Sequence, residues 1–137
     1  LARALGWLPV DQRVTRLVQT LLGDSSAEVR KAMAWQGCNM SEHPELAPLF
    51  RHVAEHDPDD SVRADGVYGM RGFLSEGDVV AYARQRLGQD PSQRVAWTVM
   101  SIANEHRDDP NGRQLLTDLT RSSYADVASS ARSSLQD

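Results

Sequence analysis

The sequence predicts an all-α protein, a stack of about four helical pairs, and three observations lead to this prediction. A short loop motif occurs four times, and each copy is followed by a stripe of small and aliphatic residues at helical spacing. The spacing between copies is almost constant, with steps of 33, 33 and 32 residues along Val29, Val62, Val95 and Val127. A repeat of this length holds one helical pair, so the repeats stack side by side.

The first helix of each repeat begins at a residue suited to a first turn. Pro9 precedes the first, and Pro44, Gly77 and Pro110, spaced by 33 residues, begin the other three. We expect these outer helices at residues 9–22, 44–56, 77–88 and 110–121, and the inner helices that follow them at 26–40, 60–74, 92–106 and 124–136. The repeats then cover residues 9–40, 41–74, 75–106 and 107–137 of a single domain spanning 1–137. Residues 1–8 have the pattern of the tail of a preceding helix.

The loop motif predicts where each inner helix starts. In the copy Asp57-Pro58-Asp59, the residue before proline is kept out of the α conformation, and a following Ser or Asp can accept hydrogen bonds from free helix N–H groups. Counted from each valine, positions +3, +4, +7 and +8 are mostly small or aliphatic. We expect this stripe to be buried between neighbouring helices.

The same motif carries a resemblance to a known family. In two copies an Asp precedes an Arg by six residues, with Val directly before the Arg: Asp24, Val29 and Arg30, then Asp57, Val62 and Arg63. This pattern resembles the start of the second helix in HEAT repeats, a type of armadillo-like helical repeat. The third copy keeps Asp90 and Val95 but has Ala96 in place of Arg, and the fourth has Ser122 and Ala128 in place of both charges.

The resemblance implies a right-handed α–α superhelix, or HEAT-like solenoid. It also implies a ladder of charged bonds along the stack, formed by Asp24, Arg30, Asp57, Arg63 and Asp90. Because Ala96 cannot continue the ladder, we expect it to stop at the third repeat. The Thr-Pro-Leu-His element of ankyrin repeats, which share the 33-residue period, does not occur in this sequence.

Composition limits the classes of function. The chain has 137 residues, 40% hydrophobic and 25% charged, as expected for one globular domain. No apolar run approaches the length of a membrane span, and a net charge of −4 disfavours a general nucleic-acid binder. A single cysteine, Cys38, cannot form an internal disulfide, which is typical of the cytoplasm. Lys31 is the only lysine among 15 basic residues, and we expect a bacterial, cytoplasmic protein.

One motif matches a pattern of metal chemistry. His52-Val53-Ala54-Glu55-His56 satisfies the H-x-x-E-H pattern of one zinc peptidase class. The apolar positions of this helix place His52 and Glu55 toward solvent, on an outer helix with no cleft for substrate. We therefore expect no metal, no cofactor and no catalytic residue; a metal site through His52 and His56 is the alternative. Cys38 is expected to be a packing residue or an inert thiol.

Asp65 stands out because it falls on the predicted buried stripe, where a carboxylate is costly unless it is paired. We expect a basic or backbone N–H partner for it. The other interpretation is that Asp65 lines a pocket: HEAT-like alkylpurine DNA glycosylases use a carboxylate and tryptophans on the concave face, and Asp65 is flanked along the stack by Trp35 and Trp97. Such an enzyme needs a basic groove for DNA phosphates, which this composition does not supply.

The inner helices carry large side chains on the face expected to be concave. Aromatic residues, Met and Arg are typical of binding hot spots. The predicted binding residues are Trp35, Val67, Tyr68, Arg71, Trp97, Met100, Asn104 and Arg132. The sequence thus predicts a non-enzymatic module that binds a protein or peptide, and Arg71 and Arg132 favour an acidic partner. The alternative is that these rings complete the core.

Overall fold

The computed structural model describes residues 10–136, and every regular element in that range is helical. The helix tail predicted at residues 1–8 lies outside the described residues. The expected outer helices are α2 (Val10–Leu22), α4 (Ala47–His56), α6 (Glu76–Gln89) and α8 (Pro110–Leu119). The expected inner helices are α3 (Ala27–Trp35), α5 (Asp60–Gly69), α7 (Gln93–Glu105) and α9 (Ala125–Gln136). The all-α class is confirmed.

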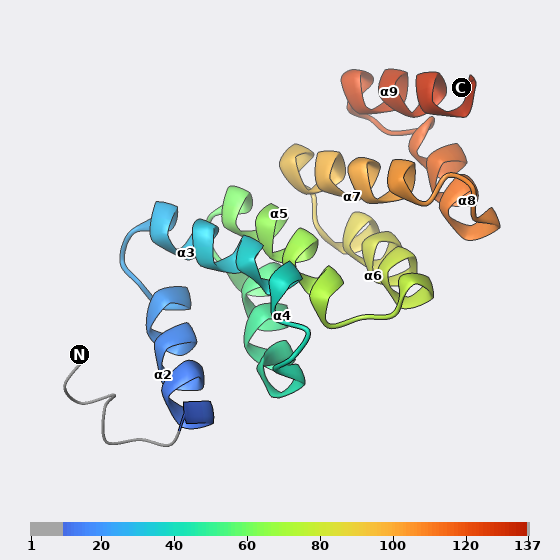
Figure 1. The fold of residues 1–137 in the computed structure, drawn as a ribbon. Coiled ribbons are helices and arrows are strands. Elements are labelled where there is room, and N and C mark those ends of the chain that lie inside the picture. Colours follow the sequence, from blue (N-terminus) through green and yellow to red (C-terminus); the bar gives the residue numbers. More distant parts are fainter. Residues whose placement is uncertain (1–9, 137) are drawn as a thin grey trace.

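The helices lie in two layers that follow the order of the chain (Figure 1). Each outer helix packs on the inner helix that follows it, and along the inner layer α3 contacts α5, α5 contacts α7, and α7 contacts α9. Short 3₁₀ turns precede α4 (Pro44–Leu46) and extend α3 (Gln36–Asn39) and α5 (Met70–Gly72). Within residues 10–136, no helix is both long enough and apolar enough to cross a bilayer.

The inner helices start at side chains of the loop motif. Ser26 caps α3 by accepting a hydrogen bond from the Val29 amide. Asp59 and Ser92 do the same for the amides in the first turns of α5 and α7. Each cap satisfies N–H groups that have no partner within the helix. The four-fold motif therefore acts locally, as a helix start signal.

Glycines set the distance between α3 and α5. A Cβ on Gly69 would lie 2.0 Å from the carbonyl oxygen of Ala34, and one on Gly72 would lie 2.1 Å from that of Gly37. A Cβ on Gly66 would lie 2.8 Å from the Cα of Ala54 in α4. Since the described glycines have no positive φ, space rather than backbone conformation requires glycine here. Gly66, Gly69 and Gly72 therefore allow α5 and the turn after it to pack directly against the backbone of neighbouring helices.

The buried stripe of the inner helices differs from the predicted one. Position +4 is buried as expected in all four repeats and position +8 in the first three, for example Val99 and Ala103 of α7. Position +3 is not buried: Ala32 is exposed, and Asp65, Thr98 and Ser130 are partly exposed. Position +5 is buried instead, at Ala34, Val67 and Met100. The buried positions differ from the predicted ones because inner helices pack against neighbouring inner helices as well as against their own outer helix, and α5 and α7 have such a neighbour on both sides.

Candidate functional site

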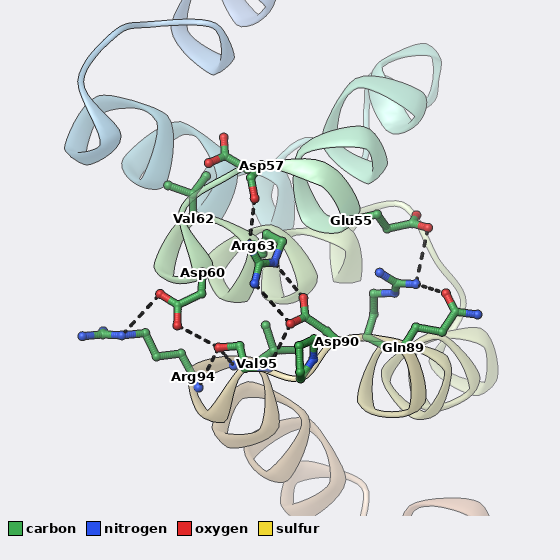
Figure 2. A network of polar contacts seen from close by, with 12 residues as sticks. Glu55, Asp57, Asp60, Val62, Arg63, Gln89, Asp90, Arg94 and Val95 are labelled. Carbon is green, nitrogen blue, oxygen red and sulfur yellow. Dashed lines mark hydrogen bonds and ion pairs between the residues drawn. The ribbon is translucent and has the colours of Figure 1, made fainter.

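Charged bonds join successive repeats along the starts of the inner helices. Arg30 Nε and Nη2 donate to the two carboxylate oxygens of Asp57 at 2.9 and 3.2 Å. Arg63 repeats this geometry on Asp90 at 2.7 and 3.2 Å (Figure 2). Each arginine also donates from Nη1 to the carbonyl oxygen of the Asp in its own repeat, Asp24 or Asp57, at 2.9 Å. The ladder interactions that the resemblance implies are present. Each arginine joins its own inner helix to the loop before that helix and to the loop of the next repeat.

The ladder side chains are largely removed from solvent. The side chain of Asp90 is 4% exposed and that of Asp57 is 5% exposed. Burial alone would raise the pKa of Asp90, but hydrogen bonds from Arg63 and the Ser92 amide, with the charge of Arg63, hold it below its usual value. The hydrogen bond that Arg30 donates to Asp57 correspondingly raises the pKa of Arg30. Asp90 and the two arginines therefore stay ionised at neutral pH.

A tyrosine takes over where the ladder stops. Ala96 occupies the arginine position of the third repeat, and Ser122 occupies the aspartate position of the fourth. Ser122 Oγ still accepts a hydrogen bond from the amide two residues later, at 3.1 Å. The hydroxyl of Tyr124 reaches back and donates to the carbonyl oxygen of Pro91. The sequence analysis missed this link, although an aromatic residue next to a lost charge pair was a visible signal.

The exposed surface of α3, α5 and α7, here called the inner face, contains only part of the predicted binding set. Trp35 and Trp97 are 40% and 37% exposed, and Tyr68 is partly exposed. Val67 and Met100 are buried at 1% and 6% exposure, so assigning them to a binding ridge was wrong. They occupy position +5, which faces the neighbouring inner helices rather than solvent.

The polar members of the predicted set are engaged within the molecule. Arg71 is paired with Glu105 at 2.7 Å. Arg132 is exposed and donates from Nη1 to the carbonyl oxygen of Thr120 at 3.2 Å. Asn104 is partly buried, and its Oδ1 is buried without a hydrogen bond in the described part of the chain. A preference for acidic partners therefore does not follow from Arg71, whose charge is neutralised.

Aromatic and charged groups of α3 and of the C-terminal end of α5 form a continuous stack. The rings of Trp35 and Tyr68 lie 5.7 Å apart and nearly parallel, with 8° between their planes. The guanidinium of Arg71 lies 4.6 Å from the centre of the Tyr68 ring. Beside this stack is an open hollow of about 360 Å³, also lined by Cys38 and His106. Burial raises the pKa of the Cys38 thiol, which opposes formation of a nucleophilic thiolate.

Asp65 lies in a second hollow, of about 260 Å³, between α3, α5 and α7. Lys31, Arg94 and Trp97 line it with Asp65. Among residues 10–136, no hydrogen bond or ion pair to the Asp65 carboxylate is present, so the expected direct partner was wrong. Burial raises its pKa, and the nearby charge of Lys31 partly offsets this. Trp35 does not line this hollow, so the predicted grouping of Asp65 with both tryptophans is only half formed.

The H-x-x-E-H motif is divided between solvent and a polar cluster. His52 and His56 are exposed, with ring centres 5.0 Å apart. Glu55 was expected to face solvent, but it accepts a hydrogen bond from the Tyr82 hydroxyl at 3.3 Å. Glu55 also pairs with the buried Arg86 at 3.6 Å, and a dashed line from Glu55 marks this ion pair in Figure 2. The described residues contain no group of three or more His, Cys, Asp or Glu side chains arranged to hold a metal ion.

Glu55, Tyr82, Arg86 and Gln89 form a polar cluster between α4 and α6, which the sequence analysis did not predict. Burial, followed by the Glu55 charge, raises the pKa of Tyr82, so its hydroxyl stays protonated and can donate. Arg86 Nη2 also bonds the side chain of Gln89. Arg86 follows Arg84 and Gln85 in a polar run, and nothing in the sequence indicated that this arginine would be buried.

Comparison of the chain with protein-family profiles, curated proteins and solved structures found no significant match. The HEAT-like assignment therefore rests on the residues of this chain and their contacts.

Proposed function

We propose that this protein is a non-enzymatic, cytoplasmic interaction module whose helical pairs form a right-handed, HEAT-like superhelix. The inner face binds a protein or peptide segment at Trp35, Tyr68 and Trp97. The observation that carries this proposal is the exposure of two tryptophans on one face. By contrast, Phe50 and Tyr82 are buried, and Phe73 and Tyr124 are partly buried against the core.

The free energy forgone by these rings supports a binding role. A fully buried tryptophan removes up to about 250 Å² from water. At 40% exposure Trp35 leaves roughly 100 Å² of ring in solvent, or about 2.5 kcal/mol of burial not realised. A partner that covers Trp35 and Trp97 recovers this free energy.

Charge on the inner face favours one kind of segment. Arg71 is neutralised by Glu105 at 2.7 Å. Arg94 is paired only at 3.7 Å with Asp60, with 65% and 45% of the two side chains exposed, and it lies with Lys31 beside Trp97, around the Asp65 carboxylate. An apolar side chain placed on Trp97, next to an acidic side chain between Lys31 and Arg94, matches this arrangement. We therefore expect the partner segment to combine an acidic and a large apolar residue.

The experiment has two stages. A photo-crosslinking amino acid at the exposed Ser101, one helical turn after Trp97, identifies the partner in native lysate, with the same group at the exposed Arg16 of α2 as the control site. Affinities of the purified partner are then measured for wild type, Trp97→Ala and Arg16→Ala, at a temperature where circular dichroism shows each variant folded. Truncation of a hot-spot tryptophan is expected to weaken binding by at least about 30-fold, or 2 kcal/mol. Equal affinities of the two variants would refute the proposal.

A DNA glycosylase-like activity is the second candidate, favoured by the absence of a hydrogen-bond or ion-pair partner for Asp65 in the Trp97 hollow. Against it, only Lys31 and Arg94 supply positive charge there, and a DNA-binding groove needs several phosphate contacts. Incubating wild type and Asp65→Asn with alkylated DNA decides the question. Release of free purine by wild type alone would establish the activity.

A further inference from the structure

Two exposed imidazoles lie next to each other at the end of α4. The buried residues of this helix, Phe50, Val53 and Ala54, leave its opposite surface to solvent. His52 and His56 lie on that exposed surface one helical turn apart, with 5.0 Å between their ring centres and 41° between the ring planes. Among residues 10–136, neither ring takes part in a hydrogen bond or an ion pair, so the ring nitrogens are open to a ligand.

The separation of the two rings matches that of imidazoles bound to one metal ion. An imidazole nitrogen binds Zn²⁺ at about 2.0–2.1 Å, so two imidazoles at 90° to tetrahedral angles around one ion have ring centres about 4.5–5.2 Å apart. The observed 5.0 Å lies in this interval. Because one helical turn carries both side chains, the second nitrogen reaches the ion in an intramolecular step, and the pair binds more tightly than either imidazole alone.

The arrangement differs from the peptidase centre that the H-x-x-E-H pattern describes. Such a centre needs a glutamate that is free to act on water. Glu55 instead accepts a hydrogen bond from Tyr82 and pairs with Arg86 at 3.6 Å. In the described part of the chain, no third His, Cys, Asp or Glu joins the two histidines. The chain therefore offers an ion two ligands and no general base, and water completes the coordination.

We propose that His52 and His56 bind one divalent transition-metal ion per chain. This is the alternative that the sequence analysis left open for the two histidines. Imidazole nitrogen selects Cu²⁺, Ni²⁺ and Zn²⁺ over Mg²⁺ and Ca²⁺, which prefer oxygen ligands.

The bound ion fixes the last turn of α4. His56 ends this helix, and the amide of the next residue, Asp57, donates to the carbonyl oxygen of Val53 at 3.1 Å. The Asp57 carboxylate in turn accepts the ladder bond from Arg30 at 2.9 Å. A metal ion held across His52 and His56 therefore stabilises the end of the helix that precedes a ladder carboxylate.

Zinc titration of the full chain tests the inference. In a Cys38→Ser background, which removes the single thiol, calorimetry measures Zn²⁺ binding to the parent chain, His52→Ala, His56→Ala and His43→Ala. His43 is the control histidine, because it lies before α4 and pairs with Glu45 at 3.3 Å. We expect one ion per chain and no competition from Mg²⁺. Loss of either α4 ligand should weaken binding by at least about tenfold, since even the loss of a partner that only orients a ligand costs about 10–100-fold. The affinity of His43→Ala should be unchanged.

Amide exchange gives a second readout that follows the helix end directly. Saturating Zn²⁺ should slow exchange of the Asp57 amide in the parent chain, because an ion that binds only the closed turn lowers the population of the open one. In His52→Ala the same amide should not respond. Circular dichroism confirms that each variant is folded, as expected for substitutions of exposed side chains.

Three outcomes overturn the inference. In the first, His52→Ala or His56→Ala binds Zn²⁺ as tightly as the parent chain. In the second, His43→Ala loses as much affinity as they do. In the third, one ion binds per two chains and light scattering shows a dimer, which places the ligands on two copies. None of these results bears on the inner face, so the inference and the proposed function are tested separately.

Discussion

Removal of the Arg63 side chain is expected to destabilise the protein by about 3 kcal/mol. Arg63→Ala deletes two bonds to Asp90, at 2.7 and 3.2 Å, and one to the Asp57 carbonyl at 2.9 Å. It also leaves a carboxylate that is only 4% exposed without its counter-charge. Breaking a buried pair in this way costs about 3–5 kcal/mol. The lower end applies because the Arg63 side chain is itself 18% exposed and the Ser92 amide still bonds Asp90.

Arg94→Ala is the matched control. Arg94 also pairs with an aspartate near the start of an inner helix, but Nε lies 3.7 Å from Asp60 and the two side chains are 65% and 45% exposed. Such exposed pairs contribute about 0–1 kcal/mol. Urea unfolding followed by circular dichroism measures both variants. If Arg63→Ala costs no more than Arg94→Ala, the ladder does not stabilise the stack and the reasoning fails.

A double variant and a pH series separate charge from packing. Arg63→Ala with Asp90→Ser reproduces the Ala96 and Ser122 pair of the next junction, and its cost should fall short of the summed single costs by about 1–3 kcal/mol. The folded-state pKa of Asp90 is lowered, so its contribution is complete above the unfolded value near 3.9 and is lost as pH falls through the folded value. The cost of Arg63→Ala should shrink accordingly in acid, whereas a cost independent of pH would assign it to packing.

Three further outcomes are expected. Gly69→Ala forces a Cβ to 2.0 Å from the Ala34 oxygen and should cost about 3 kcal/mol in thermal unfolding, whereas Gly88→Ala, with nothing within 4 Å, should be neutral or stabilising. Because burial raises the pKa of Asp65, Asp65→Asn should stabilise the protein at neutral pH, with the gain fading as pH falls toward about 4; a loss of stability in urea would contradict this. Tyr124→Phe should cost about 1 kcal/mol and accelerate amide exchange in α9 but not in α3.

The sequence predicted the helices because their signals are local. Periodic proline and glycine starts, and the caps at Ser26, Asp59 and Ser92, depend on residues a few positions apart. The bond between Asp57 and Arg30 of neighbouring repeats was predicted through the resemblance to HEAT repeats, which the spacing of Asp and Arg in the motif carries. Handedness of the stack is not encoded in such spacings.

The inner face was predicted less accurately because burial depends on three neighbours at once. The predicted stripe of buried residues assumed that each inner helix packs against one neighbour only. It therefore placed Val67 and Met100 on the surface and Asp65 in the interior, opposite to what the structure shows for the two apolar residues. Contacts with the neighbouring inner helix bury the side chains at position +5, and the side chains at position +3 remain accessible to solvent. The outer-layer pairing of Glu55 with Arg86 needs the distance between two specific helices, and no periodicity gives that distance.

The backbone contact between α3 and α5 has a consequence for ligand binding. Where carbonyl groups of α3 contact glycines of α5, no change of side-chain rotamer can alter the distance between the two helices. The spacing of Trp35 and Tyr68, which these helices carry, is therefore fixed by the backbone. Between α5 and α7 the position of Gly69 is taken by Ile102, and the spacing there depends on how side chains pack. A ligand that reaches from Tyr68 to Trp97 meets one pre-organised half, which loses little entropy on binding, and one adjustable half that can accommodate segments of different bulk.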